Sequence, residues 1–383
     1  MDGLEFELKA VGALSVPERD SWRAFVAADP ALRHPYFDLR YALAAADVAP
    51  GAGVAVVRRR GRPVGFLPFQ RRGGVIQPLG APLTDYHGVI AAPGERIGLA
   101  DLAARMGGRV FRFNGLVGGD AQPTWTMRRR LEADLSGGWS DWLSRRQADR
   151  GSVFKNLRRA ERALARDLGP VRFTLGERDP AVLDHILTRK REQMERTGWP
   201  DIFGCGWTQA LLHRLLASED EDFGARLAVL RAGDRIVSAE IGLHGAGVRH
   251  LWFPIYEPDL RRYAPGQLMT LKTLEACAEQ GLTRVDFGAG DESYKSTFAD
   301  PAEIVFEGSA AAGPWRAAAT RMLAAAVNAD PARLGRVRNA VVRRLDVVTA
   351  CEPDMGRRLE VLTRIRPETG RAVMAVTLLP IGM

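Results

Sequence analysis

The stretch FPIY at residues 253–256, followed by RRYAPGQ at residues 261–267, decides how the second half of the chain folds. It predicts a strand, a short loop and the N-terminus of a helix. The first backbone N–H groups of a helix are unpaired and the helix dipole is positive there, so this arrangement favours a bound phosphate. The alternative is an ordinary strand-to-helix turn in which Gly266 only allows the bend. One glycine does not decide between the two.

The segments around this stretch predict a mixed sheet with helices. Glycine-containing turns join three strands into an antiparallel meander. A helix capped by Asp179 and stopped at Gly198 precedes the meander, and a helix stopped at Gly281 follows it. The expected elements are strand 171–175, helix 180–197, a short helix from 208, strands 226–232, 235–244 and 248–256, a helix to 280, and strands 283–287 and 303–307.

The first half repeats this order more loosely. Its expected elements are strand 4–11, helices 17–28 and 37–46, strands 54–60 and 63–70, a segment 75–91, helix 99–106 and strand 109–116. The two halves share no residue-level repeat, so the duplication is one of pattern only. We expect a first module over 1–138, a linker over 139–152, a second module over 153–310 and an Arg- and Ala-rich C-terminal extension over 311–383.

Composition limits the classes of protein and partner. With 383 residues, of which 46% are hydrophobic, the chain has material for two ordinary domains. The net charge of +8 favours anionic partners such as coenzyme A phosphates, tRNA or an anionic membrane face. The acidic N-terminus and the arginines that interrupt the Ala-rich stretch near Ala317 predict a cytoplasmic protein without a membrane span, for which peripheral membrane association stays possible.

The spacing of the cysteines and histidines argues against a disulfide framework and against a metal centre. Cys205, Cys277 and Cys351 are widely separated and odd in number, which argues against a disulfide framework or a cysteine-based zinc site. The six histidines show no HxxxH or HxH spacing, so we expect no metal centre.

The strongest motif runs from YAPG at residues 263–266 through the helix to VDFGAGDESYK at residues 285–295. It resembles the signature of the bacterial CelD-like acetyltransferases of the GNAT superfamily, which are associated with polysaccharide biosynthesis. The resemblance implies an α+β fold of tandem GNAT-like modules, with acyl-coenzyme A, and in particular acetyl-coenzyme A, as co-substrate. It also implies that the strands at 248–256 and 283–287 splay, so that the first can pair with an acyl-pantetheine arm. Members that use acetyl-coenzyme A typically carry an Arg/Gln-x-x-Gly-x-Gly/Ala loop, whereas this chain has the single Gly266 with Pro265 beside it, which leaves less room for backbone to approach a pyrophosphate.

Four side chains are candidate catalytic residues because acyl transfer needs a proton route and an oriented acceptor. Asp286 ends a strand and faces either the cleft or its own loop as an Asx-turn cap. Glu240 interrupts an apolar strand, facing inward as a base or outward into solvent. Tyr294 could donate a proton and Lys295 could hold a phosphate or carboxylate, or both could belong to the rim.

Two further groups are candidate binding residues. The coenzyme A group consists of Ile255, Tyr256, Arg262, Tyr263, Pro265, Gly266 and Gln267. The substrate group consists of Asp85, Tyr86 and His87, expected in a cleft between modules, Lys155 on a basic amphipathic helix, and Asp291 and Glu292 beside Lys295.

Three functions fit these patterns. The first is transfer of an acyl group from acyl-coenzyme A to an amine or hydroxyl of a small-molecule or saccharide acceptor. The second is a Fem-like aminoacyltransferase, which uses tandem GNAT-like modules and aminoacyl-tRNA; the basic charge and the glycine-poor loop favour it. The third is a non-catalytic binding protein of a polysaccharide-biosynthesis system. None of the three involves DNA.

Overall fold

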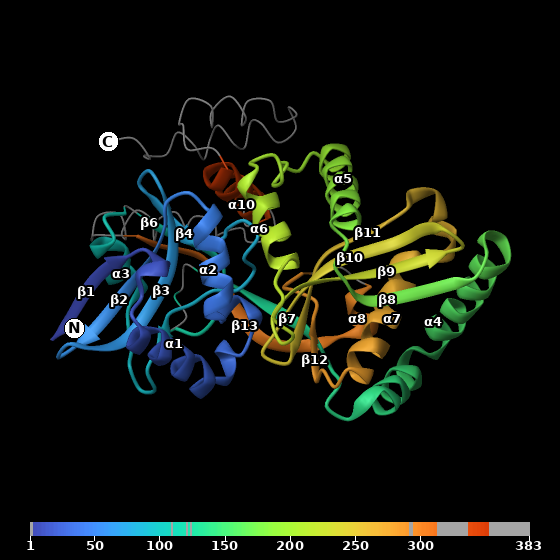
Figure 1. Ribbon diagram of the computed structural model, residues 1–383, viewed down its shortest axis with the longest axis horizontal. Coiled ribbons are helices and arrows are strands. Elements are labelled where there is room, and N and C mark those ends of the chain that lie inside the picture. Colours follow the sequence, from blue (N-terminus) through green and yellow to red (C-terminus); the bar gives the residue numbers. More distant parts are fainter. Residues whose placement is uncertain are drawn as a thin grey trace.

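The computed structural model describes residues 3–108, 110–119, 122, 125–290, 294–311 and 336–351. Within them, one mixed sheet runs through both halves in the order β1-β2-β3-β4-β6-β13-β7-β12-β11-β10-β9-β8, with β5 paired to β3. Figure 1 shows the first half at the left of the molecule and the second half at the right. The expected α+β class with a mixed sheet is confirmed.

The first half follows the predicted order closely. Its elements are β1 (Leu4–Lys9), α1 (Val16–Ala28), α2 (Leu39–Val48), β2 (Ala52–Arg59), β3 (Arg62–Arg72), β4 (Val75–Pro78), β5 (Ile90–Ala91), α3 (Leu99–Arg105), β6 (Val110–Leu116) and β7 (Thr126–Asp134), with short 3-10 turns η1 (Val11–Ala13), η2 (Pro30–Leu32) and η3 (Pro35–Phe37). Helices α1 and α2 pack on one face of the strands, and α3 packs on the other.

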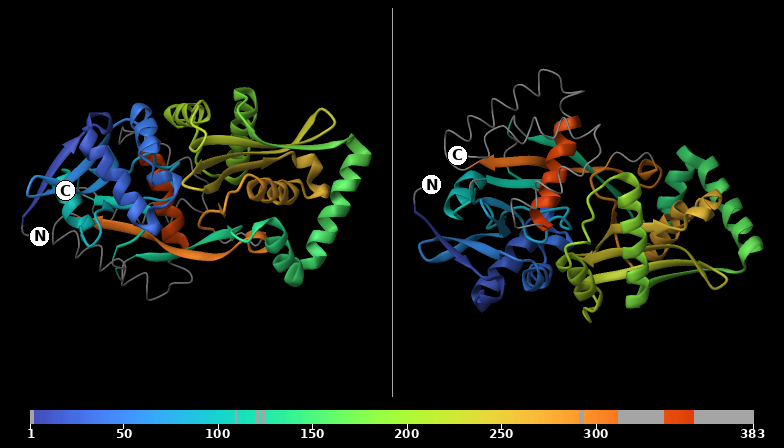
Figure 2. Two further views of the ribbon diagram at one scale, coloured as in Figure 1. Left: turned by 60° about the horizontal axis from the view of Figure 1, so that its bottom comes forward. Right: turned by 90° about the horizontal axis from the view of Figure 1, so that it is seen from above.

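The second half repeats the order strand, two helices, three strands, helix, strand. Its elements are α4 (Gly138–Leu168), β8 (Val171–Glu177), α5 (Pro180–Thr197), α6 (Trp207–Leu216), β9 (Gly224–Ala232), β10 (Arg235–Gly245), β11 (Val248–Tyr256), η4 (Pro258–Tyr263), α7 (Pro265–Glu279), β12 (Arg284–Asp286), α8 (Lys295–Phe298), β13 (Asp300–Ala311) and α10 (Arg336–Cys351). Figure 2 shows α5 and α6 on one face of β8–β11 and α7 on the other.

Helix α5 illustrates how local sequence sets an element. The Asp179 carboxylate accepts a hydrogen bond from the Ala181 N–H at 2.9 Å, which satisfies one of the unpaired donors at the helix start. Gly198 ends the helix in a left-handed conformation with φ 70°, which other residues adopt at a cost. Both predicted boundaries are confirmed.

Strands β7 and β13 tie the two halves into one sheet. Strand β13 pairs antiparallel with β6 of the first half and with β7, and β7 pairs with β12 of the second half. Figure 2 shows β13 running out of the second half and across the first. The first-half strand β7 was not predicted, because a segment with charged residues at positions 128–130, 132 and 134 does not resemble a strand until its neighbours cover it.

Residues 139–152, expected as a linker, form the first part of helix α4. The helix continues to Leu168, and its interior is interrupted only at Arg150, where φ is −131°. Trp142 and Phe154 are buried on either side of this kink, which fixes the helix against the second half. The tryptophan-containing stretch is helical, and its helix continues past residue 152 to Leu168.

Helix α10 brings the end of the described chain back to the middle of the molecule. Cys351 at its end is joined to Cys205 by a disulfide across a sequence separation of 146 residues. This corrects the expectation that the cysteines remain unpaired; the fold, which spacing cannot reveal, places the two side by side. Cys277 is buried with a free thiol. The rest of the C-terminal extension lies outside the described residues.

None of the helices in the described part of the chain is both long enough and apolar enough to cross a bilayer.

Candidate functional site

The strands β11 and β12 part at a pair of buried polar residues. They run parallel over only three residues of each strand, and the last register pair is His250 with Asp286. Beyond His250, β11 continues to Tyr256 while the chain after Asp286 turns away at Gly288. The expected splay of these strands is present, and its apex is marked by two fully buried polar side chains.

Asp286 is held by both modules. Its Oδ1 accepts hydrogen bonds from the Tyr86 hydroxyl at 3.0 Å and from the Gly288 N–H at 2.6 Å. The Gly288 contact is the Asx-type turn that the sequence suggested, and the Tyr86 contact is the link to the first module. Asp286 thus caps its own loop, as one of the two alternatives proposed, and it is completely buried.

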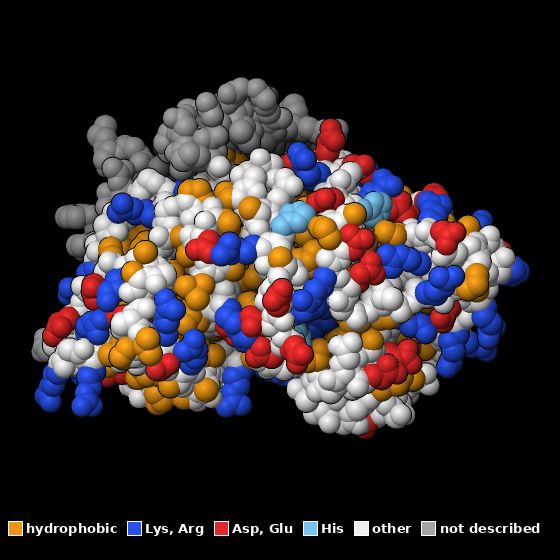
Figure 3. Space-filling view, viewed as in Figure 1, with side chains coloured by type: hydrophobic (Ala, Val, Ile, Leu, Met, Phe, Trp, Pro, Cys, Tyr) orange, Lys and Arg blue, Asp and Glu red, His pale blue; other side chains and the backbone are white. Residues whose placement is uncertain are grey.

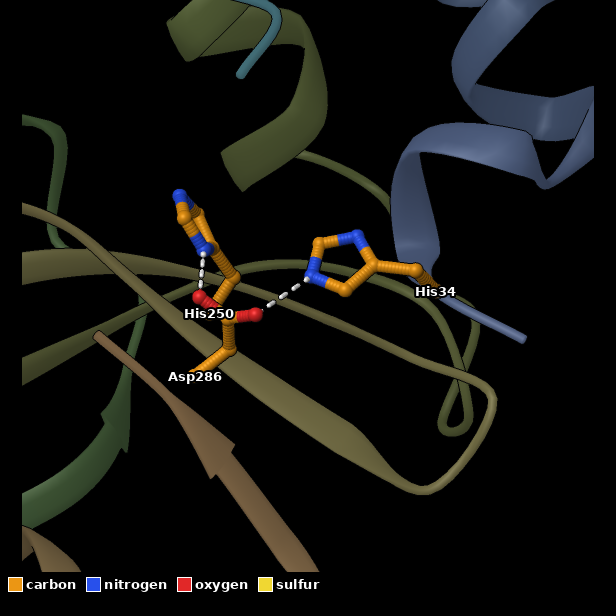
Figure 4. A group of neighbouring side chains, drawn as sticks. All are labelled: His34, His250 and Asp286. Atoms are coloured by element: carbon orange, nitrogen blue, oxygen red, sulfur yellow. Dashed lines mark hydrogen bonds and ion pairs between the residues drawn. The ribbon is translucent and has the colours of Figure 1, made fainter. Parts of the chain in front are cut away.

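His250 connects Asp286 to the surface. Its Nδ1 lies 3.2 Å from Asp286 Oδ1 (Figure 4). Its Nε2 lies 2.9 Å from Asp85 Oδ2. His250 is completely buried, whereas the Asp85 side chain is 42% exposed. Two carboxylates with an imidazole between them therefore form a path from the interior to solvent, with Asp85 at its accessible end.

The charges of this group stabilise one another. Burial by itself lowers the pKa of His250, but hydrogen bonds with Asp286 and Asp85 outweigh it and raise that pKa to about 9. Burial alone raises the pKa of Asp286, but the hydrogen bond with His250 and the charges of His250 and Arg130 hold it below its usual value. At neutral pH, His250 is therefore an imidazolium between two carboxylates.

Arg130 and His34 complete the cluster around Asp286 Oδ2. The Arg130 Nε lies 3.2 Å away. The His34 Nε2 lies 3.6 Å away (Figure 4). Burial lowers the pKa of His34 well below its usual value, so its ring is neutral. Arg130 also stacks over the Tyr86 ring at 5.4 Å and bonds Glu303 at 3.2 Å.

Ligand atoms of His34, His250 and Asp286 lie within 4.8 Å of one another, close enough to hold a metal ion. Histidine spacing missed this group because the three residues come from three different elements. The Arg130 guanidinium already lies against the Asp286 oxygen that such an ion would use, and His250 is engaged by carboxylates on both ring nitrogens. The arrangement therefore fits an ion-pair network better than a divalent cation.

Glu240 faces the interior, at 1% exposure, and is opposite Pro254 in the β10–β11 register. Arg249 NH2 donates to its Oε1 at 3.1 Å. Burial raises the pKa of Glu240, and the Arg249 charge opposes that shift. Glu240 belongs to a second buried ion pair under β11.

The residues after the splay are only partly described. Lys295 is buried at the start of α8, and Tyr294 packs against the hydrophobic cluster formed by α4, α7 and β12. Contacts of α8 with α4 and β7 hold this turn in place. Asp291 and Glu292 lie outside the described residues.

The predicted coenzyme A segment forms the expected strand, turn and helix N-terminus. Ile255 is buried and Tyr256 is 44% exposed at the end of β11. Arg262 lies over the Tyr263 ring at 4.6 Å, and the Tyr263 hydroxyl donates to Asp167 at 2.7 Å. These contacts hold the turn in place from α4.

The first turn of α7 offers fewer N–H groups than a usual phosphate site. Pro265 has none, and the N–H groups of Gln267 and Leu268 both donate to Ala264 O. Gly266 remains, and a Cβ placed there would meet only the Tyr256 ring at 3.8 Å. The turn therefore has space for a ligand and one available backbone donor among the described hydrogen bonds.

Two other predicted binding residues lie apart from the cluster. His87 is buried against Phe111 and Phe113, and burial lowers its pKa to about 3, which makes it a core residue. Lys155 is exposed on α4.

Sequence reasoning identified Asp85, Tyr86 and Asp286 and missed His250, His34 and Arg130. A histidine inside a largely apolar strand was the available signal for His250. Parallel pairing with the strand that ends at Asp286 would then have placed the two side by side. No local signal marks His34 or Arg130.

Residues 151–296, from within α4 to the start of α8, match the acetyltransferase (GNAT) domain family. The matched residues include His250 and Asp286, whereas His34, Asp85, Tyr86 and Arg130 precede them. No curated protein matches the chain.

Several solved structures share the arrangement at low identity. A tandem GNAT protein from the clavulanic acid biosynthesis pathway is 13% identical, with a TM-score of 0.49 and coverage of 81% of this chain and 99% of its own. FemX is 12% identical, with a TM-score of 0.45 and coverage of 80% and 96%. A domain ascribed to a lysylphosphatidylglycerol synthetase from Agrobacterium fabrum is 12% identical, with a TM-score of 0.46 and coverage of 81% and 95%. At these values the similarities say nothing about this chain's donor or acceptor.

Proposed function

We propose that the protein transfers an acyl group, and in particular acetyl, from acyl-coenzyme A to an amine or hydroxyl of a small-molecule or saccharide acceptor. The observation that carries this proposal is the buried Asp286–His250–Asp85 path, which starts where β11 and β12 part and ends at a half-exposed carboxylate. Beyond His250, the edge of β11 that faced β12 is no longer paired with it, and its backbone groups could bind a pantetheine arm.

Asp85 is the proposed proton acceptor. Its Oδ2 is 3.9 Å from a Cβ position at Gly288, so it lies beside the end of β12. The acceptor's nitrogen or oxygen attacks the thioester carbon, the C–S bond breaks and the acceptor's proton passes to Asp85. The thiolate gains a proton in turn, for which Tyr294 is the proposed donor. His250 and Asp286 are positioning residues, because they reach the acceptor only through Asp85.

The test is Asp85→Asn, with acetyl-coenzyme A turnover measured over a panel of amines, alcohols and amino sugars. General-base loss predicts a kcat about 10²- to 10⁴-fold lower, while the affinity for acetyl-coenzyme A stays unchanged. Asp20→Asn, at an exposed aspartate on α1, is the matched control and should retain full activity. Equal kcat for the two variants would remove Asp85 from the mechanism.

Donor choice can be tested by thermal unfolding with acetyl-coenzyme A, longer acyl-coenzyme A species or free coenzyme A. A ligand at about 100 times its Kd stabilises the native state by about 2.7 kcal/mol. We expect a shift that depends on the acyl chain and persists at moderate salt. No shift with any of these would contradict a coenzyme A donor.

The glycine-poor turn and the surface of α4 favour a second candidate, a Fem-like transferase that takes its acyl group from aminoacyl-tRNA. Lys155, Arg158, Arg159 and Arg162 are exposed on α4, and basic side chains gather over this helix at the right-hand edge of Figure 3. Phosphate contacts would make tRNA affinity fall steeply with salt. A tRNA complex that weakens steeply with salt, together with absent coenzyme A binding, would favour this candidate.

A further inference from the structure

A pocket of about 430 Å³ lies outside the cluster described above. Three parts of the fold enclose it: residues 77–82 and 112–114 of the first module, residues 190–202 of α5 and the loop after it, and residues 346–347 of α10. Phe253 of β11 forms part of its floor. The volume is within the range of pockets that bind small molecules.

Apolar side chains form most of the pocket wall. Phe113, Trp199 and Phe253 supply aromatic surface, and Met194 and Val347 supply aliphatic surface. Trp199 is 46% exposed, which is unusual for a large apolar side chain that ends a helix. This wall favours a ligand with an apolar body.

The polar end of the pocket is an ion pair. Arg112 lies 3.2 Å from the Asp346 carboxylate, and both side chains are about a fifth exposed, at 19% and 21%. The Gln77 amide donates to Asp346 O at 2.8 Å and holds α10 against the first module. The pair has no net charge, so it does not favour a charged ligand. Arg112 can donate a hydrogen bond to a ligand and Asp346 can accept one.

The second cation that lines the pocket is Lys190, which donates to Gln193 Oε1 at 3.1 Å.

The pocket borders β11, the strand that also carries His250. Phe253 lies three residues beyond His250, in the part of β11 that has left β12. A molecule that contacts Phe253 thus lies against the strand that would carry the acyl donor.

We propose that this pocket binds the acyl acceptor, and that the acceptor is amphipathic: an apolar body among Phe113, Trp199 and Phe253, and an uncharged hydroxyl or amide at the Arg112–Asp346 pair. The acceptor role rests on the proposed acyl transfer, whereas the binding site stands without it. Helix α10 is then a wall of the acceptor site, although its sequence lies outside the GNAT domain.

The test compares two substitutions on α5. Thr197 lines the pocket and is exposed, so Thr197→Phe fills the pocket without disturbing the core. Thr188 is also exposed on α5 and its hydroxyl bonds the i−4 carbonyl in the same way, but it does not line the pocket. Thr188→Phe is therefore the matched control.

The probes are 3-phenylpropan-1-ol, 3-phenylpropan-1-amine and 3-phenylpropanoate, titrated calorimetrically into the full-length protein without coenzyme A. We expect the alcohol to bind most tightly, with a Kd at least tenfold weaker in Thr197→Phe and unchanged in Thr188→Phe. Equal affinity in the two variants would overturn the site. Tighter binding of the amine or the carboxylate than of the alcohol would contradict the proposal that the polar end of the acceptor is uncharged.

Acetyl-coenzyme A titrations of the same variants separate this inference from the proposed function. We expect unchanged affinity in both. One outcome is that Thr197→Phe loses probe binding while neither the wild type nor any variant binds acetyl-coenzyme A. That outcome would support the pocket as a binding site and contradict the coenzyme A function. Acetyl-coenzyme A binding lost together with probe binding would assign the pocket to the donor and overturn the acceptor role.

Discussion

Asp286 is completely buried and contacts Arg130, His250 and Tyr86, so its removal should be costly. Asp286→Asn keeps the shape but leaves the buried Arg130 and His250 without their shared counter-charge. Breaking a buried ion pair typically costs about 3–5 kcal/mol. We expect a loss of that size in the free energy of unfolding, measured by urea denaturation.

The control for this substitution is Asp259→Asn. Asp259 pairs with Arg235, but its side chain is 59% exposed, so the change should cost less than about 1 kcal/mol. Equal losses in the two variants would mean that the Asp286 cluster contributes no more than a surface ion pair.

His250 should make stability depend on pH. Its pKa is raised from 6.5 to about 9 in the folded state, so the folded protein binds a proton that the unfolded chain has released. The stabilisation is fully present below pH 6.5 and is lost as the pH rises to 9. At about 1.4 kcal/mol per pKa unit, we expect a fall of about 3 kcal/mol.

The measurement is the free energy of unfolding in urea at intervals between pH 6.5 and 9. His250→Gln removes the titrating ring and should flatten this dependence while lowering stability at pH 6.5. A wild-type curve as flat as that of the variant would show that His250 is neutral in the folded protein.

At the level of elements, the approach of β6 to the loop before β5 sets the position of Asp85. A Cβ at Gly115 would lie 1.8 Å from the Asp85 carbonyl oxygen, so Gly115→Ala forces that backbone to move. We expect a stability loss of about 1–3 kcal/mol from overpacking and a lower kcat, because Asp85 leaves His250.

Gly12→Ala is the control, since no atom lies within 4 Å of a Cβ there. Thermal unfolding and turnover should both be close to wild type in this variant. If Gly115→Ala retained wild-type kcat, the exact position of Asp85 would not matter to the reaction.

For the whole molecule, the shared sheet predicts that both halves unfold in a single cooperative transition. Strand β13 joins β6 to β7, and β7 joins the first half to β12, so neither half has a complete sheet alone. Unfolding in urea followed by tryptophan fluorescence and by far-ultraviolet circular dichroism should give coincident curves. Two separated transitions would show that the halves fold independently.

Local sequence was sufficient to predict most helices and strands. Asp179 and Gly198 fixed the ends of α5, and glycine turns fixed the meander of β9–β11, because capping and turn geometry depend on neighbouring residues only. Strand β7 was missed, and the continuity of helix α4 through residues 139–152 was not predicted, for the complementary reason: packing against distant elements decides their structure.

The candidate site divides in the same way. The motif around Asp286 and the short run at Asp85 and Tyr86 were visible in the sequence, and their residue types suited proton transfer. Tyr86 and Asp286 are 200 residues apart along the chain, and His250 is 165 residues from Asp85. Their meeting depends on strand register, and burial shifts their pKa values only after the two halves have packed. The sequence alone thus determined the elements and the GNAT-like motif, whereas the tertiary structure decided which charges share one buried site, because sheet pairing and desolvation are properties of contacts between distant segments.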